Sequence, residues 1–557
     1  MPGGLIQLVG KGAQDQLITG NPSFTHFHTM YKRHTEFAME HFRLDFRTST
    51  IELPTQGTRS IRVRVDRNAQ LVHDCYLRIT LPDIFSPVSP VTPGISPKIA
   101  PDATAVGYDF QWIHNIGYNM IRNVSVLING TAVVTHSGEW MKFFSYTTHD
   151  ANKRGVVDHM VGHVPELHDP ANAGIRINQY PHAISSATTP ASPSINTREL
   201  VIPFHFWFCE DVGSALPLVA LQYSEVEFLV EFRNIYELFT VRDVRQTSPT
   251  FMERIAPDAA DPLFSITRFL SPPTVTGSPS NPSLTNWSAN PYVEANYIFV
   301  SDPEMVNLAK SDNAFKIKEV RMVRQDNVTG AGNDIELRMV NLCTRVVWAG
   351  QRTDIASKND WDNYTNWKEP QSSPYSTTGL PLMTPYYSSG IAQGTHIREH
   401  EILVDGVLLL DGAERFPAKQ QSFFSLLQNY RHHTGKTITS IPGMYTYSFA
   451  LDNHNTQPSG HLNGSMFNKT ILRLTTHTPP FIVAPTVTQQ CIVKSTALNQ
   501  NPVQVINPSV FNPEQVVSVI NKSSGQTYQY TYSVRAHVES YNFLRVTRGI
   551  ANVMFSS

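Results

Sequence analysis

Cysteine is scarce in this sequence and never closely paired. The four cysteines among 557 residues are Cys75, Cys209, Cys343 and Cys491, and no two of them form a C-x-x-C pair. Zinc ribbons and dithiol redox sites need such pairs, and a disulfide framework needs more cysteines in a shorter chain. The spacing therefore excludes these classes and fits a reducing compartment such as the cytoplasm.

Charge and long apolar runs are also sparse. Charged residues make up 16% of the chain, the formal net charge is −2, and no basic tail is present. Because nothing in this charge distribution attracts phosphates, we expect no direct nucleic-acid binding. The longest apolar stretch, Val201 to Cys209, contains Pro203 and His205, and it is far shorter than the ~20 residues that cross a bilayer. We expect neither a signal peptide nor a membrane-spanning helix.

The abundant residues favour strands joined by turns. The chain has 38 prolines, 30 glycines, 21 tyrosines and 29 phenylalanines, a composition typical of β-proteins. Many segments alternate apolar and polar residues, which predicts strands with one buried face. The first set of segments is 37–46, 61–65, 71–81, 124–128, 131–135, 200–208, 226–232 and 292–300. The second set is 315–323, 335–339, 345–349, 401–404, 407–410, 444–451, 469–475 and 526–538.

Short links between these segments predict hairpins. Asn129-Gly130 supplies the positive φ angles of a type I′ turn between 124–128 and 131–135. Asp405-Gly406 is expected to be the short link between 401–404 and 407–410, and 67–70 the short link between 61–65 and 71–81. In the last segment, Tyr528, Tyr530, Tyr532 and Val534 share one face, opposite Arg535.

Long links recur at the same places in both sets. They are 82–120, 136–199 and 233–291 in the first half, and 350–400, 411–442 and 476–525 in the second. We therefore expect an all-β fold of two consecutive eight-stranded antiparallel jelly-roll sandwiches with long loops at one end. The predicted domains are an N-terminal arm (1–36), a first jelly roll (37–303, with a long insertion at about 237–291) and a second jelly roll (304–557). Ser301-Asp302-Pro303-Glu304 predicts a helix start between them.

Several motifs occur in order from end to end. The arm contains Gly3-Gly4-Leu5-Ile6-Gln7-Leu8, Thr19-Gly20-Asn21-Pro22 and Tyr31-Lys32-Arg33-His34-Thr35. Later motifs are 199–209 with 215–223, then 443–451, and finally 541–546. Together they resemble the major capsid proteins of large icosahedral double-stranded DNA viruses of the nucleocytoplasmic group.

This resemblance implies a structural protein rather than an enzyme, without cofactor or metal. It implies a homotrimer whose two jelly rolls per chain form a pseudo-hexagonal capsomer that tiles an icosahedral shell. The implied partners are neighbouring capsomers, minor capsid and penton proteins, and the inner membrane side of the virion, with assembly in the host cytoplasm. The implied assembly residues lie in the arm and are Gly4, Gln14, Asp15, Thr19, Gly20, Asn21, Pro22, Tyr31, Arg33 and His34.

The glycines of the arm support this expectation independently. Gly4, Gly12, Gly20 and Pro22 interrupt it too often for a core strand or helix. We therefore expect the arm to reach outside its own fold.

A carbohydrate-binding or carbohydrate-active double β-sandwich protein is the alternative. Catalysis needs two convergent carboxylates, and Glu225, Glu227 and Glu231 are regularly spaced on one strand face, where a solvated or interface role is expected instead. Sugar stacking would use aromatic residues of the 350–400 loop. The simpler interpretation is that these residues stabilise the loop or become buried at a trimer contact. They are Trp361, Tyr364, Trp367, Tyr386 and Tyr387.

Histidines and sequons complete the candidate sites. His26 and His28, His396 and His400, and His432-His433 in a predicted loop have spacings seen in metal sites. We interpret them as surface or interface residues. Candidate glycosylation sites, relevant only if the chain meets a glycosylation machinery, are Asn286, Asn327, Asn363, Asn463 and Asn468.

Overall fold

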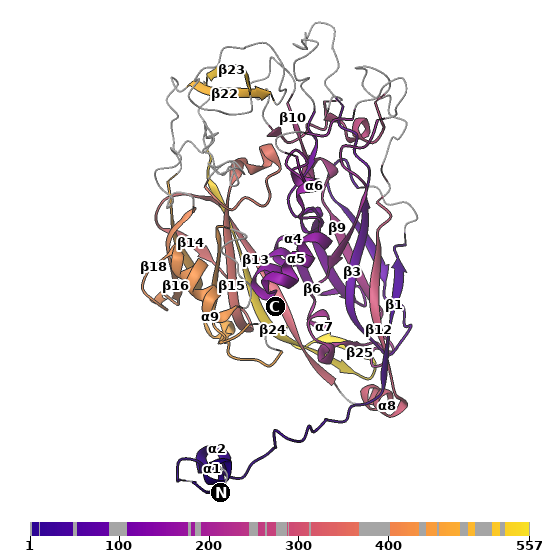
Figure 1. The fold of residues 1–557 in the computed structure, drawn as a ribbon, viewed down its shortest axis with the longest axis vertical. Helices are drawn as coiled ribbons and strands as arrows, with labels where there is room; N and C mark the ends of the chain where they lie inside the picture. Colours follow the sequence, from indigo (N-terminus) through magenta and orange to yellow (C-terminus); the bar gives the residue numbers. More distant parts are fainter. Residues whose placement is uncertain are drawn as a thin grey trace.

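The computed structural model describes residues 3–10, 12–47, 53–87, 108–176, 180–183, 191–243, 254–261, 264–273, 287, 289–310, 313–366, 401–433, 442–453, 456–478, 488–495, 515–523 and 530–555. Within these ranges no helix is both long enough and apolar enough to cross a membrane. The chain folds into two antiparallel β-sandwiches that lie side by side (Figure 1).

The first sandwich has the strand order of a jelly roll. One sheet has the order β1 (Phe37–Asp45), β12 (Tyr292–Val300), β3 (Leu71–Leu81), β7 (Arg198–Pro203), with β8 (Leu216–Pro217) beside β3. The facing sheet has the order β2 (Arg59–Arg64), β9 (Val226–Phe232), β5 (Ile121–Ile128), β6 (Thr131–Ser137). Val63, Leu77, Val124, Phe228 and Val293 are fully buried in the one core between them.

The second sandwich repeats this order. One sheet has β13 (Asn313–Val328), β24 (Tyr532–Thr547), β15 (Leu342–Arg352) and β19 (Met444–Ser448), with β20 (Leu462–Asn463) and β25 (Ile550–Val553) beside β15 and β24. The facing sheet has β14 (Asn333–Glu336), β21 (Thr470–Thr476), β16 (Leu403–Leu410) and β17 (Ala413–Glu414), with β18 (Lys419–Gln420) beside β16. The predicted pair of jelly rolls is confirmed, although short extra strands exceed the predicted count of eight.

Strands with one buried face were predicted best. The structure places β3, β9 and β12 at the predicted bounds, and in β3 every second residue from His73 to Leu81 is buried. Asn129 and Gly130 join β5 to β6 with φ angles of 53° and 79°, as the type I′ turn requires.

Two predicted hairpins are wrong. β2 pairs with β9, whereas β3 pairs with β12 and β7 in the facing sheet, so the link 67–70 crosses between sheets. Asp405 and Gly406 lie inside β16, where the register shifts beside Leu403. The turn instead falls at Asp411 and Gly412, whose φ angles of 48° and 85° join β16 to β17.

Several other predicted strands have different bounds, among them 200–208 and 526–538. The segment 200–208 leaves the sheet at Pro203, because Phe204, Phe206 and Phe208 turn inward and pack on Phe228, and α7 (Trp207–Glu210) follows. Of the last predicted strand, residues 526–529 lie outside the described residues, and β24 runs from Tyr532 to Thr547.

Helices occupy the link 136–199, which was expected to be a loop. They are α4 (Gly138–Thr148), α5 (Ala151–Met160) and α6 (Pro165–His168), and α3 (Ile116–Met120) precedes β5. Figure 1 shows α4 and α5 beside β6 and β13, near the middle of the molecule. Nearly every α4 side chain is buried, so the segment lacks the one-sided period that identifies a surface helix.

Further elements lie at the two ends of the sandwiches. At one end β10 (Phe239–Arg242) pairs with β4 (Gln111–Trp112) and β11 (Arg254–Ile255), and η4 (Ile266–Phe269) and η5 (Thr353–Lys358) lie in the long links. β22 (Thr488–Ser495) and β23 (Gln515–Ser523) form a separate hairpin. The described part of the 237–291 insertion buries Phe239, Phe264 and Phe269 in the first core. In the second sandwich, η7 (Phe423–Leu427) leads into α9 (Gln428–His432).

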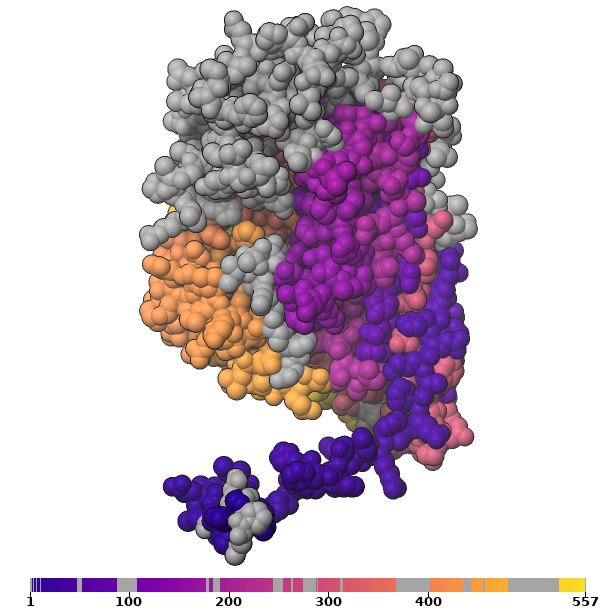
Figure 2. All heavy atoms as spheres, in the orientation of Figure 1, coloured from indigo at the N-terminus to yellow at the C-terminus, as the bar shows by residue number. Residues whose placement is uncertain are grey.

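The arm leaves the opposite end, where α8 (Asp302–Lys310) lies between the sandwiches in sequence and begins as predicted. Figure 2 shows the arm projecting clear of the body. It contains two short helices, α1 (Gly3–Val9) and α2 (Gln16–Thr19). Neither helix belongs to a core, because the residues of both whose burial is described are exposed, which agrees with the expectation that the arm forms no core strand or helix.

Candidate functional site: the interface between the two sandwiches

Helix α4 of the first sandwich is the central element of the interface. Ser137 begins it by accepting a hydrogen bond on its side chain from the Trp140 backbone N–H at 3.1 Å. Gly138 is required next, because a Cβ at this position would collide with the carbonyl oxygens of Tyr118 and Ile121. α4 is thereby held close to α3 and β5, and almost all of its other side chains are buried, with Met141 in the first core.

The first component of the interface is a set of apolar contacts. Trp140, Phe143, Phe144 and Tyr146 from the first sandwich form one buried cluster with residues of the second, which are Val347, Ala349, Tyr364 and Met444. Aromatic side chains contribute the largest buried area per residue. This cluster therefore supplies a large apolar contribution to the contact.

Glu139 carries one of three ion groups in the interface. Its carboxylate lies 2.8 Å from Arg535 Nε and 3.2 Å from His537 Nε2, both on β24, and it accepts a hydrogen bond from the Tyr364 hydroxyl at 3.0 Å. Burial alone would raise the pKa of Glu139, but Arg535 and then His537 hold it well below its ordinary value. The carboxylate therefore stays charged and tied to β24.

Lys142 forms the second group, one turn further along α4. Its side chain is fully buried, and its ammonium pairs with Asp362. The same carboxylate accepts hydrogen bonds from the side-chain amides of Asn115 and Asn119, the latter at 3.0 Å. Burial opposes ionisation of Asp362, but Lys142 and these amides lower its pKa below the usual value. A buried charge with a full set of partners is compatible with a stable interface.

The third group joins both sandwiches through four charges. Arg345 on β15 pairs with Glu539 on β24, and it also donates a hydrogen bond to Thr147 Oγ1 of α4 at 3.1 Å. Lys318 on β13 lies 3.7 Å from Glu539 and 2.5 Å from Glu210 of α7. Burial would raise the pKa of Glu539, but Arg345 and Lys318 lower it.

Polar contacts extend the interface to both ends. At one end, Asn359 donates hydrogen bonds to the carbonyls of Tyr236 and Phe239 at 2.6 and 2.8 Å. At the other, the Tyr223 backbone N–H donates to the Gly549 carbonyl at 3.0 Å. The two sandwiches are therefore joined along their length.

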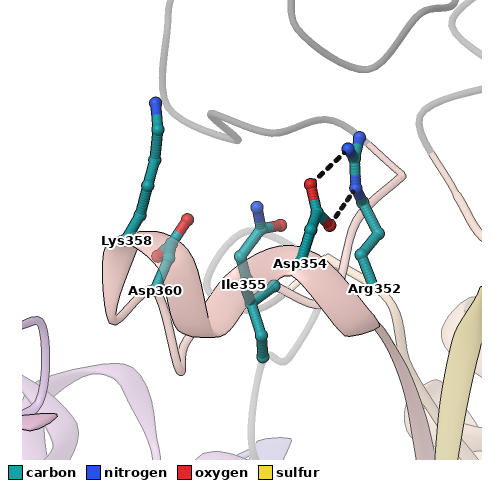
Figure 3. Close-up of a pocket in the computed structure, with 6 residues that line it drawn as sticks. Arg352, Asp354, Ile355, Lys358 and Asp360 are labelled. Atoms are coloured by element: carbon teal, nitrogen blue, oxygen red, sulfur yellow. Dashed lines mark hydrogen bonds and ion pairs between the residues drawn. The ribbon is translucent and has the colours of Figure 1, made fainter. Parts of the chain in front are cut away.

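Two cavities lie beside the interface, a small one at η5 and a larger one between β6 and β13. Figure 3 shows a pocket at η5 in which Asp354 accepts two hydrogen bonds from Arg352, at 2.8 and 2.7 Å. Its volume of about 10 Å³ is the space of a single water molecule. A larger cleft of about 300 Å³ lies between β6 and β13. The interface chemistry is thus charge pairing and apolar packing between two halves of one chain.

The predicted arm residues are gathered on the projecting segment rather than in this interface. Those from Gln14 to His34 are all exposed. Asp15 accepts a hydrogen bond from the Gly12 backbone N–H at 2.7 Å, and Asn21 has a φ angle of 48°. Gly20 ends α2 where a Cβ would collide with the Gln16 carbonyl. Their role in assembly stays a prediction.

The sequons have different surroundings. Asn327, Asn463 and Asn468 are exposed. Asn363 is 1% exposed and accepts two hydrogen bonds from Thr365, so a glycan at Asn363 does not fit the folded chain. Asn286 lies outside the described residues.

Among the described residues, neither the pair His26 and His28 nor the pair His432 and His433 is brought together with further metal ligands. His26 and His28 are exposed on the arm, and His396 and His400 lie outside the described residues. His432 is the last residue of α9 rather than part of a loop, because η7 and α9 form one helical segment there.

Residues of the carbohydrate alternative have structural partners. Glu225 and Glu227 pair with Arg64 and Arg47, at 3.2 and 2.6 Å, and Glu231 accepts a hydrogen bond from Asn123. Trp361 donates a hydrogen bond to the Glu237 carbonyl, and Tyr364 is buried. Both aromatics therefore serve the contact between the sandwiches. Trp367, Tyr386 and Tyr387 lie outside the described residues.

Sequence reasoning missed the charged residues of the interface. Lys142 stands within the apolar run Trp140 to Phe144, and a lysine in such a run is a signal for a buried ion pair. Arg535 was placed on the face opposite the tyrosines, which is correct, but that face meets α4 rather than solvent. Only the packing of the second sandwich on the first makes this face an interior one.

Comparisons with known proteins agree with the fold. Residues 25–270 match the family described as major capsid protein N-terminus, and residues 304–511 match the family described as large eukaryotic DNA virus major capsid protein. The chain is 25% identical over 535 residues to the major capsid protein of Phaeocystis pouchetii virus, with 85% of this chain and 93% of that protein covered. It is 22% identical over 569 residues to the major capsid protein of Paramecium bursaria Chlorella virus 1, with both chains fully covered.

Solved structures show the same architecture. The Faustovirus major capsid protein has a TM-score of 0.60 at 12% identity, covering 98% of this chain and 96% of its own. A chain of the PBCV-1 virus capsid has a TM-score of 0.58 at 18% identity, covering 96% of this chain and 100% of its own. At these identities the likeness is one of fold.

Proposed function

The chain belongs to the family of major capsid proteins of large eukaryotic DNA viruses, and from this premise we propose that three copies assemble into a capsomer with a pseudo-hexagonal outline. Each copy contributes two sandwiches of the same strand order, so a trimer contains six similar blocks. Six such blocks around one axis fill a plane. The capsomers then tile the icosahedral shell of the virion.

The observation that carries this proposal is the buried joint between the sandwiches. A capsomer that tiles a shell needs a fixed angle between the two sandwiches of each chain. A weak interface between domains normally allows them to move relative to each other. Here α4 contributes an aromatic cluster and the ion groups of Glu139 and Lys142, and these side chains are largely or fully buried. The joint is therefore suited to hold one geometry in every copy.

The arm supplies contacts beyond the block. Its apolar side chains are unusually exposed for a soluble segment, with Leu17 at 90%, Ile18 at 88% and Phe27 at 98%. Exposed apolar groups of this kind mark surfaces that become buried against a partner. We assign these residues to contacts with neighbouring capsomers, with minor capsid and penton proteins, or at the inner membrane side of the virion.

The protein acts as a structural component without enzymatic activity in this proposal. The buried acids Glu139, Asp362 and Glu539 are each paired with a cation, as expected of a scaffold. Assembly takes place in the host cytoplasm, and neither nucleic acid nor a cofactor is needed for it.

Native mass spectrometry of the purified full chain tests the oligomer. We expect a species of three times 62.5 kDa at micromolar concentration, together with larger assemblies that are multiples of it. A monomer or dimer that persists as concentration rises would contradict the proposal.

A further inference from the structure

Three histidines of the first sandwich bring their rings to one place. His114 follows β4, His163 lies in the turn between α5 and α6, and His168 ends α6. One ring nitrogen from each lies within 4.8 Å of one from each of the others. The ring centroids are 4.0 Å apart for His114 and His168, 5.1 Å for His163 and His168, and 5.6 Å for His114 and His163.

One nitrogen of each ring lacks a protein partner. Nδ1 of His114, of His163 and of His168 is buried in each case and makes no hydrogen bond. A buried nitrogen without a hydrogen-bond partner normally lowers the stability of the fold by about 1–3 kcal/mol. Three such nitrogens at one place therefore indicate a ligand that all three contact. A metal ion would satisfy one nitrogen of each ring at once.

We propose that His114, His163 and His168 bind a divalent transition-metal ion of the zinc type, with a fourth position open to water. Imidazole nitrogen is a preferred ligand of Zn²⁺ and its neighbours in the first transition row. Zn–N bonds of about 2.0–2.1 Å place tetrahedral ligand atoms about 3.4 Å apart. Ring movements on the order of 1 Å therefore close the present arrangement around an ion.

The backbone around the rings is already fixed. The Asn119 side-chain amide donates a hydrogen bond to the His114 carbonyl at 2.8 Å, and the His163 backbone N–H donates to the Asp158 carbonyl at 2.7 Å. Gly162 turns the chain just before His163 with a φ angle of 78°, where a larger residue would also press on Leu200 and Ile116. A ligand set on such a rigid frame loses little freedom when it binds an ion.

The electrostatic surroundings are mixed. Asp362 acts on both His114 and His168 and favours a cation there, whereas Lys142 and Arg254 act on His114 in the opposite sense.

Such an ion would tie the α5–α6 turn to β4 within the end of the first sandwich. Its role would be structural, since it joins segments that are distant in sequence. The histidine pairs selected by spacing did not include these three, because His114 precedes His163 by a long interval that only the fold closes.

Metal content of the untagged oligomer tests the proposal. The protein is stripped with a chelator, equilibrated with Zn²⁺, freed of unbound ion and analysed for bound zinc by mass spectrometry. We expect about one tightly bound ion per chain, and at least a tenfold loss in the double variant His163→Ala/His168→Ala. The matched control is His159→Ala, which removes an exposed histidine of α5 and should keep the ion. Equal zinc in the wild type and the double variant, or an equal loss in the control, would overturn the proposal.

The wild-type protein alone provides a second test if the double variant does not fold. Co²⁺ should give the strong visible absorption of a nitrogen-ligated site with few ligands, and Zn²⁺ should raise the thermal midpoint whereas Mg²⁺ should not. Weak octahedral Co²⁺ absorption together with no shift in midpoint would overturn the assignment.

Discussion

Replacing Glu539 with glutamine tests whether the buried ion group stabilises the joined sandwiches. Glu539 is 1% exposed, and its carboxylate forms ion pairs with both Arg345 and Lys318. Glu539→Gln keeps the size of the side chain but leaves these two cations with the single carboxylate of Glu210. Removing one partner of a buried pair costs about 3–5 kcal/mol. Because glutamine still accepts a hydrogen bond from Arg345, we expect a loss of about 3 kcal/mol, near the lower limit.

The second sandwich offers a matched control in the pair of Arg473 and Asp334. This pair also joins directly opposed residues of neighbouring antiparallel strands, as Arg345 and Glu539 do. Its side chains are 48% and 41% exposed, with Arg473 Nε 2.6 Å from Asp334 Oδ1. Solvent weakens such a pair strongly, so Asp334→Asn should leave stability almost unchanged.

Urea unfolding followed by tryptophan fluorescence measures both variants. A loss of 3 kcal/mol corresponds to roughly a hundredfold change in the unfolding equilibrium, and it lowers the urea midpoint in proportion to the unfolding slope. The reasoning is refuted if Glu539→Gln and Asp334→Asn shift the midpoint equally, since burial would then make no difference to the two pairs.

Three further predictions concern the α4 joint, a buried histidine and the arm. Gly138→Ala should lower the free energy of unfolding by about 2 kcal/mol or more, because the new Cβ collides with two carbonyl oxygens. The control Gly155→Ala places its Cβ in open space on α5 and should not lower the thermal midpoint. Equal midpoints for the two variants would contradict the packing argument. Burial lowers the pKa of His136 from 6.5 to about 3. Between pH 6.5 and pH 5 this histidine therefore becomes protonated in the unfolded chain but stays neutral in the folded chain, and the free energy of unfolding should fall by about 2 kcal/mol. His136→Leu should remove this part of the pH dependence in urea titrations, and an unchanged slope would show that the ring is accessible to protons. Leu17→Glu/Ile18→Glu should leave the mass of the trimer unchanged but abolish larger assemblies in light scattering, while Val156→Glu, at an exposed position of the body, should not; loss of the trimer itself would contradict the assigned role of the arm.

Strand bounds could be predicted from the sequence where one face of the strand packs on the core and the other face is less buried. In β3 and β9 the alternation is clear, and the predicted bounds agree with the structure. The Asn129-Gly130 turn was predicted by its chemistry alone, since both residues need positive φ.

Prediction failed where both sides of an element are buried. In β24 residues on both faces are buried from Val538 to Tyr541, because one face meets its own core and the other meets the first sandwich. The alternation that defines a strand is lost there, and the predicted strand stopped at Val538. α4 was missed for the same reason, because almost all of its surface is covered.

The Asp405-Gly406 pair shows a second kind of failure. Its residue types fit a type I′ turn, yet both lie within β16, and Gly406 accepts the close approach of Leu474 and Phe424. The actual turn at Asp411-Gly412 has the same residue types. Local turn chemistry cannot choose between two such pairs, and the register with β21 makes the choice.

The candidate site was predictable only in part. The motifs of the arm predict an assembly role that stays a prediction, whereas the ion groups of Glu139, Lys142 and Glu539 join residues up to several hundred positions apart in sequence. Their pairing depends on how one sandwich packs on the other, which no local pattern encodes.

Electron cryo-microscopy of the isolated oligomer tests the central claim most directly. If two sandwiches per chain are held rigidly by α4, three chains should form a particle with true threefold symmetry and six similar lobes around its axis. Each chain should trace through two adjacent lobes, with α4 density between them. A particle in which each lobe comes from a separate chain, or in which the two sandwiches of one chain adopt variable angles, would contradict the account.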